Sequence, residues 1–145
     1  MSAASENGTK TFDLSVVTPE GPVYEGEAQM LIVPGAAGEI GVLARHAPLV
    51  AMLQAGEIRV RAGGEWQSFA AGPGYFKVQQ DRAIALVDDA VKAEEIDVEQ
   101  ARREAEEARA RLERIDSGED KDSDRWQVEQ RLRHAENKIA VAGRG

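Results

Sequence analysis

Few residues of this chain could carry out covalent or acid–base chemistry. The 145 residues include two histidines and no cysteine, which excludes thiolate nucleophiles, disulfides and cysteine-based zinc sites. His46 stands next to Ala47-Pro48 and His134 among charged residues, and neither belongs to a Ser-His-Asp grouping. We therefore expect no catalytic residue and no metal, and we expect His134 to be a solvated surface residue.

Phosphate-binding signatures are also missing from the sequence. It contains no G-x-x-x-x-G-K-S/T loop, and Gly72-x-Gly74 lacks the downstream glycine and helix of a dinucleotide fingerprint. We therefore expect no cofactor and no catalysis by the chain itself.

The net charge and the apolar runs exclude other partners. A formal charge of −8 opposes binding to nucleic acid and to anionic lipid headgroups. The longest apolar run, Ala47 to Leu53, is far shorter than the roughly 20 residues that cross a bilayer. We expect a soluble, cytosol-compatible protein without direct membrane insertion. Residues 1–10 are polar and lack the apolar segment of a secretory signal, so a disordered tail is expected there.

The elements that would position any site change type along the chain. Residues 11–92 contain short stretches of alternating apolar residues, separated by glycine- and proline-containing turns. Because no helical crossovers intervene, an antiparallel β-sandwich is expected. Phe12, Leu14 and Val16 should share one face, and the same alternation is seen in Met30 with Ile32, Ile58 with Val60, and Ile84 with Leu86.

The clearest predicted hairpin is centred on two adjacent glycines. Gly63 and Gly64 can both take the positive φ values of a type I′ turn. Strands 56–62 and 65–71 should therefore pair.

A helical hairpin is predicted over residues 96–142, with helices at about 97–115 and 124–142 and a loop at 116–123. Asp97 and Asp124 stand at capping-box spacing before Gln100 and Gln127. Apolar residues recur at steps of three and four in both helices, which predicts antiparallel packing along a coiled-coil seam: Ala101, Ala105, Ala108, Leu112 and Ile115, then Val128, Leu132, Ala135, Ile139 and Ala142.

Alanine makes this predicted seam weak. Each buried methyl contributes roughly 0.8 kcal/mol, and several residues of the stripe are alanine. Such a hairpin could exchange its own contacts for contacts with another protein whose binding energy exceeds a gap of a few kcal/mol. The weak seam is therefore a physical basis for a conformational switch.

Three ordered segments carry a resemblance to a known family. They read V-V-T-P-E-G-P-V-Y over 16–24, G-E-I-G-V-L-A-R-H-A-P-L-V over 38–50 and G-P-G-Y-F-K-V over 72–78. Together with the charged helical tail, they resemble the epsilon subunit of the rotary, proton-translocating F-type ATP synthase, and the likeness spans Phe12 to Ala142.

The resemblance implies a non-catalytic rotor subunit of the central stalk. The sandwich would couple the gamma subunit to the ring of c subunits. The hairpin, when extended, would contact the catalytic alpha and beta subunits and inhibit ATP hydrolysis. The chain would then lie at the cytoplasmic face of the plasma membrane as a peripheral part of the complex.

The resemblance also implies a c-ring and gamma interface formed by Glu39, Ile40, Gly41, Arg45 and His46. The residues alone favour another interpretation. Glu39 would then be a solvated glutamate in a tight turn at the tip of the sandwich, and His46 would hydrogen-bond its own loop.

ATP-binding epsilon subunits carry Ile/Leu-Asp-x-x-Arg-Ala at the start of the hairpin. Here the segment includes Asp97, Gln100 and Ala101, so a neutral amide replaces the arginine that would face a polyphosphate. Glu107 adds a negative charge one helical repeat further on, which Arg103, Arg133 and Lys138 could offset only in part. We expect weak or absent ATP binding.

Several arginines of the hairpin are candidate inhibitory contacts by resemblance: Arg109, Arg111, Arg131 and Arg133. Arginines mixed with glutamates usually only keep a helix soluble. Two other functions are alternative interpretations of the sequence. One is a structural adaptor of another assembly with the same architecture. The other is a free-standing nucleotide-binding regulator or hydrolase, which the missing phosphate loop and the altered Asp-x-x-Gln segment disfavour.

Overall fold

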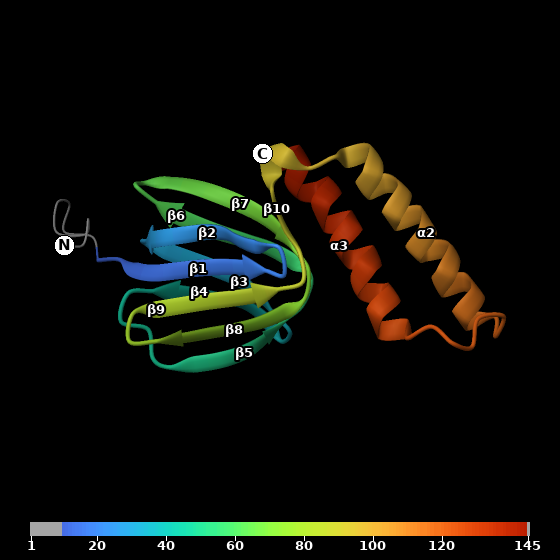
Figure 1. Ribbon diagram of the computed structural model, residues 1–145, viewed down its shortest axis with the longest axis horizontal. Coiled ribbons are helices and arrows are strands. Elements are labelled where there is room, and N and C mark those ends of the chain that lie inside the picture. Colours follow the sequence, from blue (N-terminus) through green and yellow to red (C-terminus); the bar gives the residue numbers. More distant parts are fainter. Residues whose placement is uncertain (1–9, 145) are drawn as a thin grey trace.

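The computed structural model describes residues 10–144, so the tail predicted at residues 1–10 lies outside this range except for Lys10. Ten strands are followed by a 3₁₀ turn and two α-helices (Figure 1). In chain order they are β1 (Phe12–Thr18), β2 (Gly21–Ala28), β3 (Met30–Gly35), β4 (Gly38–Leu43), β5 (Leu49–Leu53), β6 (Gly56–Ala62), β7 (Glu65–Ala71), β8 (Gly74–Gln79), β9 (Arg82–Val87), β10 (Ala90–Lys92), η1 (Ala93–Glu95), α2 (Val98–Asp116) and α3 (Arg125–Arg144).

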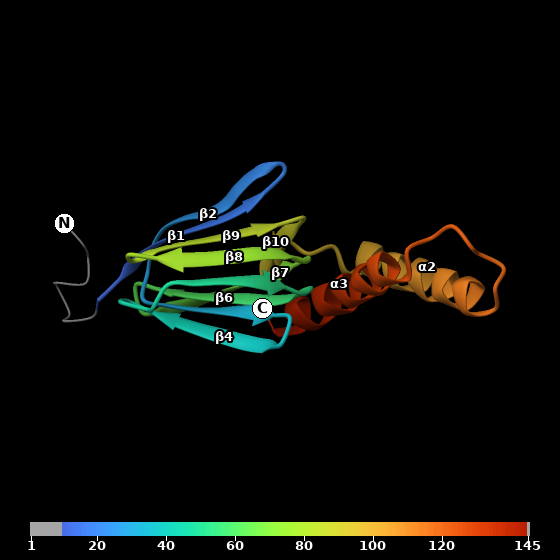
Figure 2. The same ribbon diagram turned by 90° about the horizontal axis from the view of Figure 1, so that it is seen from below.

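The strands form a two-layered sandwich, as predicted (Figure 2). Hydrogen-bonded neighbours follow the order β10-β7-β6-β3-β5-β8-β9-β1-β2, and β4 pairs with the free side of β3. The two layers are linked where Gly35 of β3 pairs with Leu53 of β5. All the strand pairs are antiparallel except β1 with β9, which run parallel.

The core lies between the two layers and is made of fully buried aliphatic and aromatic side chains. Its largest members are Phe69, Phe76, Leu14, Leu31, Ile58, Val16, Val33, Val42, Val60 and Val78. The Tyr24 ring meets Phe69 edge to face, with ring centroids 6.4 Å apart. Because the core is closely packed, the outer faces of the sandwich form rigid surfaces.

Phe12, Leu14 and Val16 are buried together on one face, as predicted, and Ile58 and Val60 are also buried together. The alternating pairs Met30 with Ile32 and Ile84 with Leu86 lie on the faces of β3 and β9 that point away from the core. Their buried residues are Leu31 and Val33 in β3, and Ala83, Ala85 and Val87 in β9. Both strands are apolar on both faces, so alternation could not separate the inside from the outside.

The predicted glycine hairpin is confirmed. Gly63 and Gly64 have φ values of 60° and 79°, as a type I′ turn requires. Residues of β6 and β7 pair in the expected register, from Gly56 with Ala71 to Ala62 with Glu65.

The two helices form an antiparallel pair, and α3 lies between α2 and the sandwich (Figure 1). The seam buries mostly alanine: Ala101, Ala105, Ala108, Val128 and Ala135. The other residues of the predicted stripe are only partly buried. Among the described residues, neither helix is long and apolar enough to span a bilayer.

The Gly72-Pro73-Gly74 segment is explained by a close approach of two chain segments. A Cβ on Gly74 would lie 1.9 Å from the carbonyl oxygen of Leu86, and a Cβ on Gly72 would lie 1.8 Å from Oδ1 of Asp88. Gly74 pairs with Leu53 on one side and Val87 on the other. The glycines let three strands meet where a side chain would not fit.

Replacing Gly74 by alanine is expected to lower the free energy of unfolding by about 1–3 kcal/mol, because the backbone of β9 must move to admit the methyl group. Gly41→Ala is the matched control, since its Cβ would meet only Cε of Met30 at an ordinary 3.8 Å. Urea denaturation of both variants measures the effect. Equal stability of the two variants would contradict the steric explanation.

Candidate functional site

The five predicted interface residues do not form one cluster. Glu39, Ile40 and Gly41 belong to β4, whereas Arg45 and His46 lie in the loop between β4 and β5. The strand rises about 3.4 Å per residue, so Glu39 and the end of β4 at Leu43 are roughly 14 Å apart. Glu39 and the loop with Arg45 and His46 therefore lie toward opposite ends of β4.

The sequence had suggested that Glu39 lies in a tight turn. In the structure it lies in β4, where it pairs with Pro34. Its carboxylate accepts from Nη2 of Arg59 on β6, with an N–O distance of 3.2 Å. Its side chain is mostly exposed, and such surface ion pairs contribute about 0–1 kcal/mol. Ile40 points the other way and packs against the core, while Gly41 is exposed.

The loop after β4 is tied to the turn between β8 and β9. The backbone N–H of Arg45 donates to the carboxylate of Asp81, and Arg45 has a left-handed φ of 66°. His46 Nδ1 donates to the carbonyl oxygen of Ala47 at 2.7 Å. His46 thus hydrogen-bonds its own loop, which was one of the two interpretations of this residue.

A second feature, missed by the sequence reasoning, is an exposed apolar surface on the outside of β5, β8 and β9. Four of its side chains are strongly exposed: Val50 at 69%, Met52 at 55%, Tyr75 at 58% and Leu86 at 48%. Met52 pairs with Tyr75, and Tyr75 pairs with Leu86, so these three side chains form one row across the strands. We call these four residues the outer apolar patch.

A signal for this patch was present in the sequence. The β5 segment reads L-V-A-M-L and the β9 segment reads A-I-A-L-V, so neither alternates between apolar and polar residues. Strands that are apolar on both faces are typical of sheets covered on both sides. Contiguous exposed apolar side chains are typical of protein–protein contact sites.

The degenerate ATP-binding segment acts as a helix cap. Asp97 Oδ1 accepts from the backbone N–H of Gln100 at 3.1 Å, which satisfies one of the free donors at the start of α2. Gln100 is exposed, and Ala101 is buried in the seam. These three residues together account for the start of a helix.

The four candidate inhibitory arginines have different surroundings. Arg109 pairs with Glu136 across the seam, at 2.9 Å, and Arg133 donates to Oε1 of Gln54 on the sandwich. Arg111 and Arg131 line a cavity of about 410 Å³ between the helices, which Glu104 also lines. In this arrangement all four face the hairpin itself or the sandwich.

The structure contradicts the prediction that His134 is a solvated surface residue. Its side chain is only 13% exposed, and Nε2 donates to Oδ2 of Asp89 at 2.8 Å. Asp89 lies between β9 and β10, so this bond joins α3 to the sandwich. The local sequence around His134 could not show this contact, because the partner is 45 residues away.

The pKa values of the two neighbouring carboxyl groups at this contact, Asp88 and Asp89, shift in opposite directions. The hydrogen bond from His134 lowers the pKa of Asp89 below its usual value, because it stabilises the ionised form. Burial raises the pKa of Asp88, which has no such bond from His134. Asp89 is therefore the ionised partner in the contact between α3 and the sandwich.

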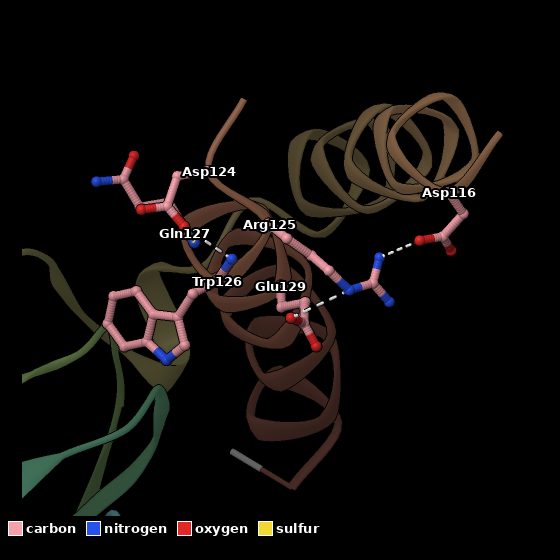
Figure 3. Close-up of polar contacts among 6 residues, drawn as sticks. All are labelled: Asp116, Asp124, Arg125, Trp126, Gln127 and Glu129. Atoms are coloured by element: carbon pink, nitrogen blue, oxygen red, sulfur yellow. Dashed lines mark hydrogen bonds and ion pairs between the residues drawn. The ribbon is translucent and has the colours of Figure 1, made fainter. Parts of the chain in front are cut away.

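The loop between the helices is closed by polar contacts that Figure 3 shows in detail. Asp124 Oδ1 accepts from the backbone N–H of Trp126 at 2.9 Å and caps α3. The Arg125 guanidinium bonds Asp116 at the end of α2 and Glu129 one turn into α3. Arg125 thus links the two helix ends across the loop.

Comparisons with known proteins agree with this architecture. The family model for the β-sandwich domain of the ATP synthase delta/epsilon chain matches residues 11–93. The ATP synthase epsilon chain of Halalkalibacterium halodurans is 39% identical over 134 residues, which cover 92% of this chain and 98% of the relative. That of Desulforamulus reducens is 42% identical over 103 residues, covering 71% and 78% respectively.

A solved structure resembles most of the chain as well. It is a chain in the mitochondrial ATP synthase of Euglena gracilis, described as OSCP/F1/c-ring. The TM-score is 0.71 with 26% sequence identity, covering 90% of this chain and 81% of that one. With a matching sandwich domain and relatives aligned over both the sandwich and the hairpin, the chain belongs to the ATP synthase epsilon chain family.

Proposed function

We propose that the chain is a non-catalytic central-stalk subunit of an F-type ATP synthase, in which the sandwich couples the gamma subunit to the c-ring. The observation that carries this proposal is the outer apolar patch. It lies on a well-packed sandwich and leaves Val50, Met52, Tyr75 and Leu86 exposed to water. Binding of another protein to this face would remove its apolar side chains from water, which is favourable.

Gamma is the partner we assign to this patch. A rotor component must transmit torque, and torque requires a contact that does not slide. Rows of side chains on a rigid sheet can interlock with a partner, whereas a mobile loop cannot. Glu39, near the start of β4, is assigned to the c-ring side of the interface.

We assign the helical hairpin to inhibition of ATP hydrolysis. Its seam is made largely of alanine, so the free-energy cost of separating the helices is small compared with that of opening the sandwich core. Once extended, the helices would offer Arg109, Arg111, Arg131 and Arg133 to acidic groups of the alpha and beta subunits. The complex would hold the chain at the cytoplasmic face of the plasma membrane.

A charge placed in the outer apolar patch is expected to disrupt binding to gamma. Tyr75→Glu should weaken binding of the purified chain to gamma by about 30-fold or more, because it places a charge at the centre of a desolvated contact. Trp66→Glu is the matched control, since Trp66 is an aromatic residue 47% exposed on β7, outside the patch. Calorimetric titration with gamma measures both, and native-like binding by Tyr75→Glu would refute the assignment of the patch.

Deleting residues 97–145 is expected to leave assembly and proton-coupled ATP synthesis intact while raising the ATP hydrolysis rate severalfold. The sandwich keeps its core and its outer apolar patch without the hairpin, and only the proposed inhibitory element is lost. Complexes reconstituted with the full-length and shortened chains should be compared in the same assay. An unchanged hydrolysis rate would remove the inhibitory part of the proposal.

A further inference from the structure

The attachment of the hairpin to the sandwich runs through one helix. α3 contacts β6, β7 and η1, and α2 packs on α3. Figure 1 shows the same order, with α3 between the sandwich and α2. Release of α3 from the sandwich would therefore free both helices.

Three side chains on two successive turns of α3 make polar contacts with the sandwich. Gln130 Oε1 accepts from the buried backbone N–H of Ala55 at 3.0 Å. Arg133 donates to the side chain of Gln54, and His134 donates to Asp89. We call this set the docking clasp: Gln54, Asp89, Gln130, Arg133 and His134.

The apolar part of the same attachment is small. Near the end of α3, Val141 is buried in a cluster with Ala70 and Ala93, and Ile96 packs beside it. Two of these four residues are alanine, which contributes little apolar area per side chain. Hydrogen bonds to partly buried partners, one of them an ionised carboxylate, therefore carry much of the attachment.

The segment from Asp97 to Ala101, which resembles an ATP-binding motif, has another role in this chain. Asp97 caps α2, the residue at the cationic position is Gln100, and Glu107 lines the cavity between the helices. Arg111, Arg114 and Arg131 also line that cavity, but the segment from Asp97 to Ala101 itself offers a polyphosphate no cation, so this segment does not fit a nucleotide well.

We propose that the docking clasp, together with the small cluster around Val141, holds the hairpin against the sandwich, and that no nucleotide is needed for this docked state. The use of the clasp in regulation rests on the proposed function. The docked state itself is a property of this chain, because every contact of the clasp lies within it. Loss of one clasp residue should therefore shift the hairpin toward its released state, and ATP should not shift it back.

Amide hydrogen exchange of the full-length chain tests the proposal, because exchange of α3 reports how often the helix opens. His134→Ala should raise the opening of α3 about tenfold, since it breaks a bond to a charged group, and Gln130→Ala about fivefold. Gln127→Ala is the matched control, one turn earlier on the same helix and exposed, and should exchange as the unmodified chain does. Saturating magnesium-ATP should leave α3 exchange unchanged in every variant.

Two results would overturn the proposal. One is a large decrease of α3 exchange on addition of ATP to the unmodified chain. The other is native-like α3 exchange in both His134→Ala and Gln130→Ala. Amides of β1 and β9 serve as the folding reference, so a variant with a disturbed sandwich is recognised and the second variant decides. Because no ATPase rate is measured, the result stands apart from that of the hairpin deletion.

Discussion

The attachment of α3 to the sandwich is the interaction on which the arrangement of the chain depends. The chain leaves the sandwich after η1, runs out along α2 and returns along α3. Only the returning helix makes the side-chain bonds of the docking clasp. These bonds and the small cluster around Val141 therefore decide whether the hairpin and the sandwich behave as one body or as two.

The two parts of the chain differ in how their stability is built. The sandwich buries large side chains such as Phe69 and Phe76 completely, and opening it would expose them to water at a high free-energy cost. The hairpin attachment uses polar groups, which water can satisfy after release, and small apolar groups, which lose little. A stable body with a releasable appendage follows from this difference in composition.

The same contrast explains where the sandwich can bind partners. Its outer apolar patch belongs to strands that are fixed by the core from the other side, as Leu53 and Phe76 are buried beneath the row that includes Met52 and Tyr75. Binding to this face would therefore cost little ordering of the backbone. A partner bound there would be joined to a rigid surface, which the transfer of torque requires.

Much of the architecture could be predicted from the sequence because its signals are local. The glycine turn at residues 63–64, the cap at Asp97 and the three- and four-residue steps of alanine are all visible within one element. The features that the sequence analysis missed depend on contacts with distant parts of the chain. The outward direction of Leu86 depends on which face of β9 meets the other layer, and both faces are apolar.

The contact of His134 with Asp89 and the position of Glu39 in β4 were missed for the same reason. A histidine among charged residues resembles any surface residue until the sheet brings a carboxylate to it. Glu39 follows the glycine at position 38, which suggested a turn, but pairing with Pro34 extends β4 to include it. Side-chain contacts between elements were therefore the part that the sequence could not show.

Cross-linking the docked state tests the central claim most directly. The chain has no cysteine, so Gln54→Cys and Arg133→Cys introduce a unique pair at the docking clasp, which a bifunctional maleimide can join. If release of the hairpin causes inhibition, the assembled complex should hydrolyse ATP faster after cross-linking than the same variant before it. Equal inhibition before and after cross-linking would show that the hairpin need not leave the sandwich, and would contradict the account.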